Sequence, residues 1–260
     1  MTHTAWDAFW SALPAEPGAA LWDSSPELTA ARHLPLFRDR ADPLLPLVDL
    51  GCGNGRQTQW LADHFPRVVG LDIAESAVAL AARTHPAPNV AYRRADLLDH
   101  GTAAALHTEL GDVNVYMRGV LHQLDQDDRV RLLDSIAVLL GASGLLFAQE
   151  LTEHTGWYVS ELLATGAALP KTAGLAAHFG FGARLAPACE GQLRLLFEKR
   201  GFEVVADGDI ALHTTENSAD GRPLQLPTSY LVARSAADAR NTAARTTGAR
   251  NTAPGTPPHA

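Results

Sequence analysis

The chain has 260 residues, of which 46% are hydrophobic and 19% are charged, and its formal net charge is −8 at pH 7. This composition predicts a globular protein rather than a disordered chain, and the acidic balance disfavours nucleic acid as a partner. Two distant cysteines exclude a disulfide scaffold, and the absence of a leader or a long apolar run predicts a cytoplasmic protein without membrane spans.

Residues 1–43 are predicted to form a helical lid or substrate segment. Aromatic residues recur at helical spacing from Trp6 to Leu13, and a second helix is expected from Pro26 to about Arg40. The tryptophans either pack against the main body or cover a small-molecule pocket, and the sequence leaves both interpretations open. Under the second interpretation, Trp10 and Trp22 bind substrate.

Residues 44–150 alternate between short apolar runs and helical patterns. Strands are predicted at Leu44–Leu50, Arg67–Leu71, Val90–Arg93, Val113–Met117 and Leu145–Gln149, and helices at Asn54–Phe65, Ala74–Arg83 and Asp127–Leu140. Such alternation indicates parallel strands with crossover helices. We therefore expect a Rossmann-like, doubly wound α/β fold with helices on both faces of the sheet.

The alternation ends after Glu150. Residues 152–187 are predicted to be a variable substrate-recognition segment with short helices, placed near the sheet edge where ligands bind. A helix is expected at Cys189–Arg200, and two short strands at Phe202–Ala206 and Ser229–Ala233, separated by an irregular stretch, complete a mostly parallel seven-stranded sheet in a domain spanning 44–234. Residues 235–260 have no large apolar side chain and are expected to form a disordered tail.

A glycine-rich turn separates the first predicted strand from the first helix of this domain. It reads Val48-Asp49-Leu50-Gly51-Cys52-Gly53-Asn54-Gly55-Arg56. Glycine lets a ligand approach the backbone closely, and the helix start offers unpaired N–H groups. Asp72 ends the next strand, where a carboxylate can accept hydrogen bonds from two ribose hydroxyls. These features indicate a nucleoside cofactor. The dinucleotide pattern GxGxxG requires a glycine where this chain has Arg56.

The glycine order GxGxG resembles motif I of the class I S-adenosylmethionine-dependent methyltransferases of small-molecule type. The strings Gly70-Leu71-Asp72-Ile73, Arg94-Ala95-Asp96-Leu97 and the stretch Asp112–His122 resemble further motifs of that family. The resemblance implies S-adenosyl-L-methionine as cofactor. It also implies these contacts: Asp49, Gly51, Cys52 and Gly53 at the methionine end, Asp72 at the ribose, Ile73 and Leu97 on the adenine, Asp96 at the adenine amino group, and Met117 or Arg118 under the sulfonium.

The resemblance implies methyl transfer by in-line displacement in a closed pocket, for which the protein aligns the reactants and excludes water. The fourth motif lacks the Asn/Asp-Pro-Pro-Tyr/Phe string of enzymes that methylate base or glutamine amino groups. We therefore expect a small metabolite, methylated on O or N, as in secondary metabolism. His122 is the candidate general base, because an imidazole can take up a proton near neutral pH, although it can also be a packing residue.

Weaker candidates for substrate binding lie in the variable segment: His154, Trp157 and Tyr158. No metal-ligand spacing occurs, so we expect no metal site. The predicted partner is a small-molecule acceptor, without nucleic acid or membrane, and the predicted assembly is a monomer or homodimer. Two alternatives stay open: an NAD(P)-dependent reductase on the same fold and a non-catalytic cofactor-binding module.

Overall fold

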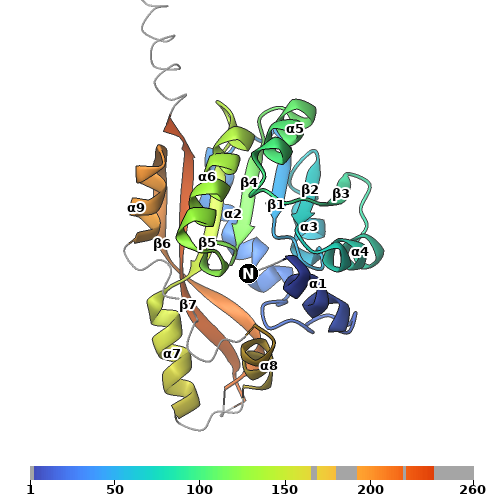
Figure 1. Cartoon of the computed structure of the whole chain (residues 1–260), viewed down its shortest axis with the longest axis vertical. Coiled ribbons are helices and arrows are strands. Elements are labelled where there is room, and N and C mark those ends of the chain that lie inside the picture. Colours follow the sequence, from blue (N-terminus) through green and yellow to red (C-terminus); the bar gives the residue numbers. More distant parts are fainter. Residues whose placement is uncertain (1–2, 165–168, 180–191, 219–220, 237–260) are drawn as a thin grey trace, which may run out of the picture.

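The computed structural model describes residues 3–164, 169–179, 192–218 and 221–236. Within them the chain forms a seven-stranded sheet, in the order β3-β2-β1-β4-β5-β7-β6, with helices on both faces (Figure 1). The strands are β1 (Leu47–Leu50), β2 (Val68–Asp72), β3 (Val90–Arg94), β4 (Asn114–Arg118), β5 (Leu146–Leu151), β6 (Phe202–Asn217) and β7 (Pro223–Ser235). The α-helices are α1 (His3–Ala12), α2 (Ala30–Phe37), α3 (Arg56–Leu61), α4 (Glu75–Thr84), α5 (His100–Leu110), α6 (Gln126–Leu140), α7 (Glu153–Ala164), α8 (Pro170–Phe179) and α9 (Gln192–Lys199).

The strand order reverses between β1 and β4. The chain runs outward from β1 to β3 and then returns to place β4 in parallel beside β1, followed by β5. Strand β7 pairs antiparallel with both β5 and β6, so the sheet is mixed. The predicted Rossmann-like fold is confirmed. Ligands of such folds bind at the carboxyl ends of the strands beside the reversal point.

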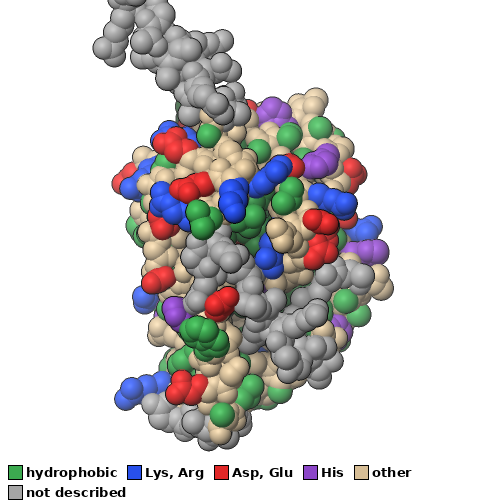
Figure 2. Space-filling model, turned by 60° about the vertical axis from the view of Figure 1, so that its left-hand side comes forward, with side chains coloured by type: hydrophobic (Ala, Val, Ile, Leu, Met, Phe, Trp, Pro, Cys, Tyr) green, Lys and Arg blue, Asp and Glu red, His purple; other side chains and the backbone are tan. Residues whose placement is uncertain are grey.

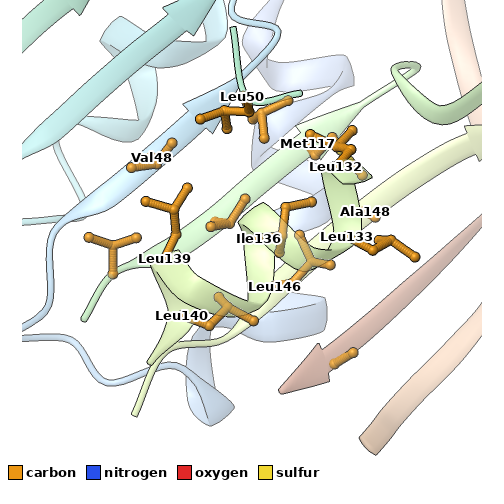
Figure 3. Packing of buried hydrophobic residues seen from close by; sticks show 14 of the residues in the cluster. Val48, Leu50, Met117, Leu132, Leu133, Ile136, Leu139, Leu140, Leu146 and Ala148 are labelled. Atoms are coloured by element: carbon orange, nitrogen blue, oxygen red, sulfur yellow. The ribbon is translucent and has the colours of Figure 1, made fainter. Parts of the chain in front are cut away.

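The central strands are buried on both faces. On one face Tyr116 and Phe147 pack against Phe37 of α2 and the residues of α3. On the other face α5, α6 and α9 cover the sheet, and Figure 3 shows residues of α6 packed against β1, β4 and β5. Strands covered on both sides carry mostly apolar side chains on both faces. The predicted continuous apolar runs follow from this arrangement.

The predicted helix from Pro26 to Arg40 is broken in the structure. A 3₁₀ turn at Pro26–Leu28 precedes α2, and a second one at Arg38–Arg40 follows it. Thr29 interrupts the helix because its φ of −127° and ψ of −93° lie outside the helical region. Helix α2 covers the sheet, with Phe37 fully buried, so part of segment 1–43 belongs to the core rather than to a lid.

The prediction of an irregular stretch between the last two strands is wrong. Strands β6 and β7 are continuous and form a long antiparallel hairpin, paired from Phe202 and Ser235 to Asn217 and Pro223. The far half of this hairpin extends past β5, and α7 and α8 lie beside it (Figure 1). Polar side chains such as Asp209 interrupt the apolar pattern of β6, and ladder hydrogen bonds with β7 maintain the strand there.

Two predicted segments lie partly outside the described residues. These are the tail at 235–260, of which 237–260 are not described, and the variable segment, of which 165–168 and 180–187 are not described. The predicted helix Cys189–Arg200 is described from Gln192 as α9. Within the described ranges, every helix is too short or too polar to cross a membrane. On the face shown in Figure 2, Lys and Arg side chains are interspersed with Asp and Glu.

Candidate functional site

A cavity of about 980 Å³ lies at the carboxyl ends of the central strands. Its size is at the upper end of the range for ligand pockets, roughly 300–1,000 Å³. One part, here called the glycine-loop half, is lined by Leu50–Asn54, Leu71–Ile73 and Ala95–Leu98. The other part, here called the hairpin half, is lined by residues at the end of β5 and on α7, α8, β6 and β7. Arg118, at the end of β4, lies between the two.

The glycine loop has a backbone that other residues would strain. Gly51 and Gly53 have φ values of +76° and +55°, in the left-handed region. A Cβ atom on Gly51 would lie 2.8 Å from Cγ2 of Val120, and one on Gly53 would lie 2.7 Å from Cζ2 of Trp10. The loop backbone is therefore closely covered by the turn after β4 and by α1.

Asp72 connects this loop to the start of α4. Its Oδ2 accepts a hydrogen bond from Gly53 N and its Oδ1 accepts one from Ala74 N, both at 2.9 Å. Burial raises the pKa of the Asp72 carboxyl, and the hydrogen bonds from the backbone N–H groups oppose that rise. Asp72 lines the cavity, so its carboxylate can also accept hydrogen bonds from hydroxyl groups of a ligand there.

Asp96 occupies the equivalent place after β3. Its side chain is exposed, and its Oδ1 accepts a hydrogen bond of 2.9 Å from Leu98 N. Ile73 and Leu97, which directly follow Asp72 and Asp96, are apolar residues of the same cavity wall. The glycine-loop half thus combines two carboxylates with an apolar surface.

Two predicted cofactor contacts do not reach the cavity. Asp49 is buried beneath the loop, where it accepts a hydrogen bond of 2.5 Å from Thr58 Oγ1. Burial raises the pKa of the Asp49 carboxyl to about 6, although the Thr58 hydrogen bond and the Arg118 charge oppose it. Met117 is fully buried among α6 side chains (Figure 3), because it faces the same side of β4 as Val115. Arg118, one residue later, lines the cavity.

His122 pairs with Glu150, which the sequence analysis did not select. Both residues line the cavity, and His122 Nδ1 lies 3.0 Å from Oε2 of the fully buried Glu150 side chain. Backbone N–H groups of Val120, Leu121 and His122 also donate to this carboxylate, at 2.9, 2.9 and 3.2 Å. Because a carboxylate only accepts, Nδ1 is the donor, and Nε2 of the neutral ring keeps its lone pair. Glu150 could have been selected from the sequence, because it is an acidic residue at the end of an apolar run.

Aromatic side chains from the N-terminal segment form part of the cavity wall. Trp6, Trp10 and Trp22 line the cavity. Trp6 lies 4.5 Å from Phe179 of α8 between ring centroids, and Phe9 stacks on Trp22 at 5.7 Å. The predicted packing is therefore present in one aromatic cluster that also lines the cavity, and the covering role stays a prediction.

Helix α7 carries three predicted substrate-binding residues, and only one of them lines the cavity. Trp157 lines it together with residues at helical spacing: Glu153, Gly156, Ser160 and Leu163. His154 and Tyr158 lie on another face of the helix and line a separate recess beside Asp209 and Pro227. The prediction that His154 and Tyr158 contribute to the same pocket as Trp157 is corrected by this helical geometry.

Helix α8 is attached to the hairpin and to the N-terminal segment through polar contacts. Lys171 Nζ donates to the carbonyl of Gly18 at 2.5 Å and to Thr215 Oγ1 at 2.6 Å. Thr172 Oγ1 donates to Oε2 of Glu216 at 2.7 Å. These contacts fix the wall to which Thr172 belongs. The described residues contain no group of three or more His, Cys, Asp or Glu side chains suited to a metal ion.

Known proteins resemble this chain in sequence and in fold. Residues 47–144 match the family described as "Methyltransferase domain". A solved SAM-dependent methyltransferase from Anabaena variabilis ATCC 29413 is 32% identical, has a TM-score of 0.80, and aligns over 90% of this chain and 94% of its own. An N-methyltransferase from Bradyrhizobium japonicum WM9, solved with S-adenosyl-L-homocysteine, is 17% identical with a TM-score of 0.55 over 88% and 97% of the two chains, which is a likeness of fold.

Two curated relatives match shorter segments. N-demethylindolmycin N-methyltransferase of Streptomyces griseus is 33% identical over 94 residues, which make up 35% of this chain and 40% of that protein. Trans-aconitate 2-methyltransferase of Deinococcus radiodurans is 32% identical over 113 residues, 43% of this chain and 40% of that protein. The chain thus matches less than half the length of either curated relative.

Proposed function

Since this chain belongs to the S-adenosylmethionine-dependent methyltransferases, we propose that it transfers a methyl group from this cofactor to an oxygen or nitrogen atom of a small molecule. One observation carries the proposal: the glycine loop with Asp72 and the His122–Glu150 pair line the same cavity. Two curated relatives are named for small molecules, which supports the same acceptor class. A monomer or homodimer remains our prediction for the assembly.

The glycine-loop half suits the cofactor that the sequence motifs imply. Gly51 and Gly53 have no side chains of their own, and an added Cβ atom would collide with Val120 or Trp10 of the cavity wall. Asp72 has acceptor capacity for the two ribose hydroxyls, and Ile73 and Leu97 provide apolar surface for the adenine. Asp96 accepts from the adenine amino group. Asp49 supports the loop through Thr58 instead of touching the methionine end.

When bound, S-adenosylmethionine supplies a methyl group activated by a sulfonium. The protein then has to align the acceptor atom with that methyl group and to exclude water. The aromatic cluster of α1, Trp22 and α8 covers the cavity and serves the second purpose. The hairpin half receives the acceptor, because α7, α8 and the hairpin surround it beyond the strands that hold the cofactor.

His122 acts on the acceptor as a general base. Glu150 holds the ring by Nδ1, so that Nε2 can take the proton of a hydroxyl as the methyl group is transferred, or the proton of an ammonium group before the transfer. The backbone N–H groups that bind Glu150 keep the carboxylate in place at the same time. Glu150 is therefore a positioning residue for the base.

Calorimetric titration with S-adenosyl-L-homocysteine tests the cofactor site. Asp72→Asn should weaken binding roughly 10- to 100-fold, since hydrogen bonds to a charged group contribute about 1.5–3 kcal/mol. Asp125→Asn is the matched control, because Asp125 caps α6 by accepting from Asp128 N and does not line the cavity. If the two variants bind S-adenosyl-L-homocysteine with equal affinity, the proposal that Asp72 binds the ribose is refuted.

Transfer is tested with labelled S-adenosylmethionine and an extract of the source organism, separated into small-molecule, protein and nucleic acid fractions. The label should enter the small-molecule fraction, and His122→Ala should reduce its entry. Label confined to protein or nucleic acid would refute the proposed acceptor class. No transfer to any fraction would favour a non-catalytic binding module.

A further inference from the structure

Two buried polar atoms that have no partner among the described residues lie on neighbouring residues of the cavity, and we infer that they bind the methyl acceptor. They are Nη1 of Arg118 and Oε1 of Gln149. One is a donor and the other an acceptor. The matching substrate is an apolar molecule that presents a hydrogen-bond acceptor beside an N–H donor, as an amide does. This inference rests on the proposed function and names the substrate class of the same site.

The orientation of the Gln149 amide follows from its neighbours. Gln149 is 2% exposed, and its Nε2 lies 2.8 Å from Oγ1 of Thr228. Thr228 Oγ1 donates its single proton to the carbonyl of Ile210 at 2.5 Å. The hydroxyl can therefore only accept from Gln149, which makes the bonded end of the amide the NH₂ group. Oε1 is left without a partner among the described residues.

Arg118 lies beside Gln149 in the sheet. The two residues are register partners on the parallel strands β4 and β5, so their side chains leave the same face of the sheet. One guanidinium nitrogen of Arg118 is buried and has no partner in the described part of the chain, whereas the group also interacts with the Tyr116 hydroxyl and with the charge of Asp49. Arg118 is the one Lys or Arg among the described residues that line the cavity.

The surrounding walls indicate what kind of molecule carries the matching polar group. Apolar side chains from β5, α7, β6 and β7 line this half: Leu151, Val159, Leu163, Leu212 and Leu226. Buried polar groups in proteins are nearly always hydrogen-bonded, and an unpaired one loses its hydration without compensation. A ligand that donates to Gln149 and accepts from Arg118 removes both deficits, while its apolar body contacts the leucines.

The cofactor is a less suitable occupant of this pair. Gln149 is on β5 and bonds to Thr228 of β7, whereas the glycine loop and Asp72 follow β1 and β2 on the other side of β4. The topology therefore places Gln149 in the hairpin half. A variant of Gln149 should change acceptor binding and leave cofactor binding unchanged.

The experiment uses the full chain, with and without saturating S-adenosyl-L-homocysteine, and two aromatic probes of similar size. Naphthalene-2-carboxamide offers both an acceptor and N–H donors, and N,N-dimethylnaphthalene-2-carboxamide offers only the acceptor. We expect the first probe to bind at least fivefold more tightly in calorimetric titrations. Gln149→Met keeps the side-chain length and should abolish this preference, with the Kd for S-adenosyl-L-homocysteine changed less than twofold.

Gln123→Met is the matched control, because Gln123 lines the same cavity but its Nε2 is bonded to the Gly119 carbonyl. It should keep the preference for the primary amide. Equal binding of the two probes by the unmodified protein would overturn the inference, since water alone would then satisfy the two atoms. Tighter binding of naphthalene-2-carboxylate than of the carboxamide would replace it with an anion site at Arg118.

A tenfold or larger loss of S-adenosyl-L-homocysteine affinity in Gln149→Met would assign the pair to the cofactor and also overturn the inference. The titration with S-adenosyl-L-homocysteine alone tests the proposed function. The probe titrations without it test the acceptor site separately, so the two failures can be distinguished.

Discussion

The contact between the glycine loop and Trp10 makes a quantitative prediction for Gly53→Ala. Alanine at a φ of +55° costs about 1–2 kcal/mol of backbone strain. Its Cβ would also lie 2.7 and 2.9 Å from two ring atoms of Trp10, and overpacking of this kind costs roughly 1–3 kcal/mol. We therefore expect Gly53→Ala to lower the free energy of unfolding by about 2–5 kcal/mol.

Urea unfolding of four proteins separates the two contributions. They are the unmodified chain, Gly53→Ala, Trp10→Ala and the double variant. In the double variant the clash is gone, so its loss should be smaller than the sum of the single losses by about 1–3 kcal/mol. Gly221→Ala is a control for backbone strain, since Gly221 has a φ of +79° and no atom of the described residues lies within 4 Å of an added Cβ. Additive losses would refute the placement of α1 over the loop.

Two further predictions concern buried carboxylates. The folded-state pKa of Asp49, raised to about 6 from its ordinary value of 3.8, makes the unmodified protein lose stability as the pH rises from 4 to above 6, by roughly 3 kcal/mol in total. Urea unfolding of Asp49→Asn from pH 4 to 8 should not show this loss. If the free energies of unfolding of the unmodified protein and of Asp49→Asn differ by the same amount at every pH, the raised pKa of Asp49 is contradicted. Glu150→Gln should lower kcat roughly 10²-fold with unchanged S-adenosyl-L-homocysteine affinity, because the amide donates to Nδ1 of His122 and moves the ring proton to Nε2. An unchanged kcat would show that His122 is not the base.

Several features of the fold could be predicted because they depend on neighbouring residues. The apolar runs marked the parallel strands, since strands buried on both faces carry mostly apolar side chains. Glycines at positive φ and an acidic residue at the end of the next strand marked the glycine-loop half of the cavity. Both signals are local, so the fold class, the family and the cofactor could be inferred before the tertiary structure was known.

Register and helix faces were harder to predict. One position along β4 separates Met117 in the core from Arg118 at the cavity, because side chains alternate between the two faces of a strand. The face of α7 likewise separates Trp157 from Tyr158. Polar residues within β6 concealed its full length, which depends on pairing with β7.

The amino-acid sequence alone determined the α/β fold and indicated the cofactor, since the apolar runs and the glycine-loop motif are each encoded within a few neighbouring positions. Only the tertiary structure decided that Glu150 holds His122 and that Gln149 lies beside Arg118 on the neighbouring strand. These contacts join residues about 30 positions apart, and they form because parallel strands bring their carboxyl ends to one edge of the sheet.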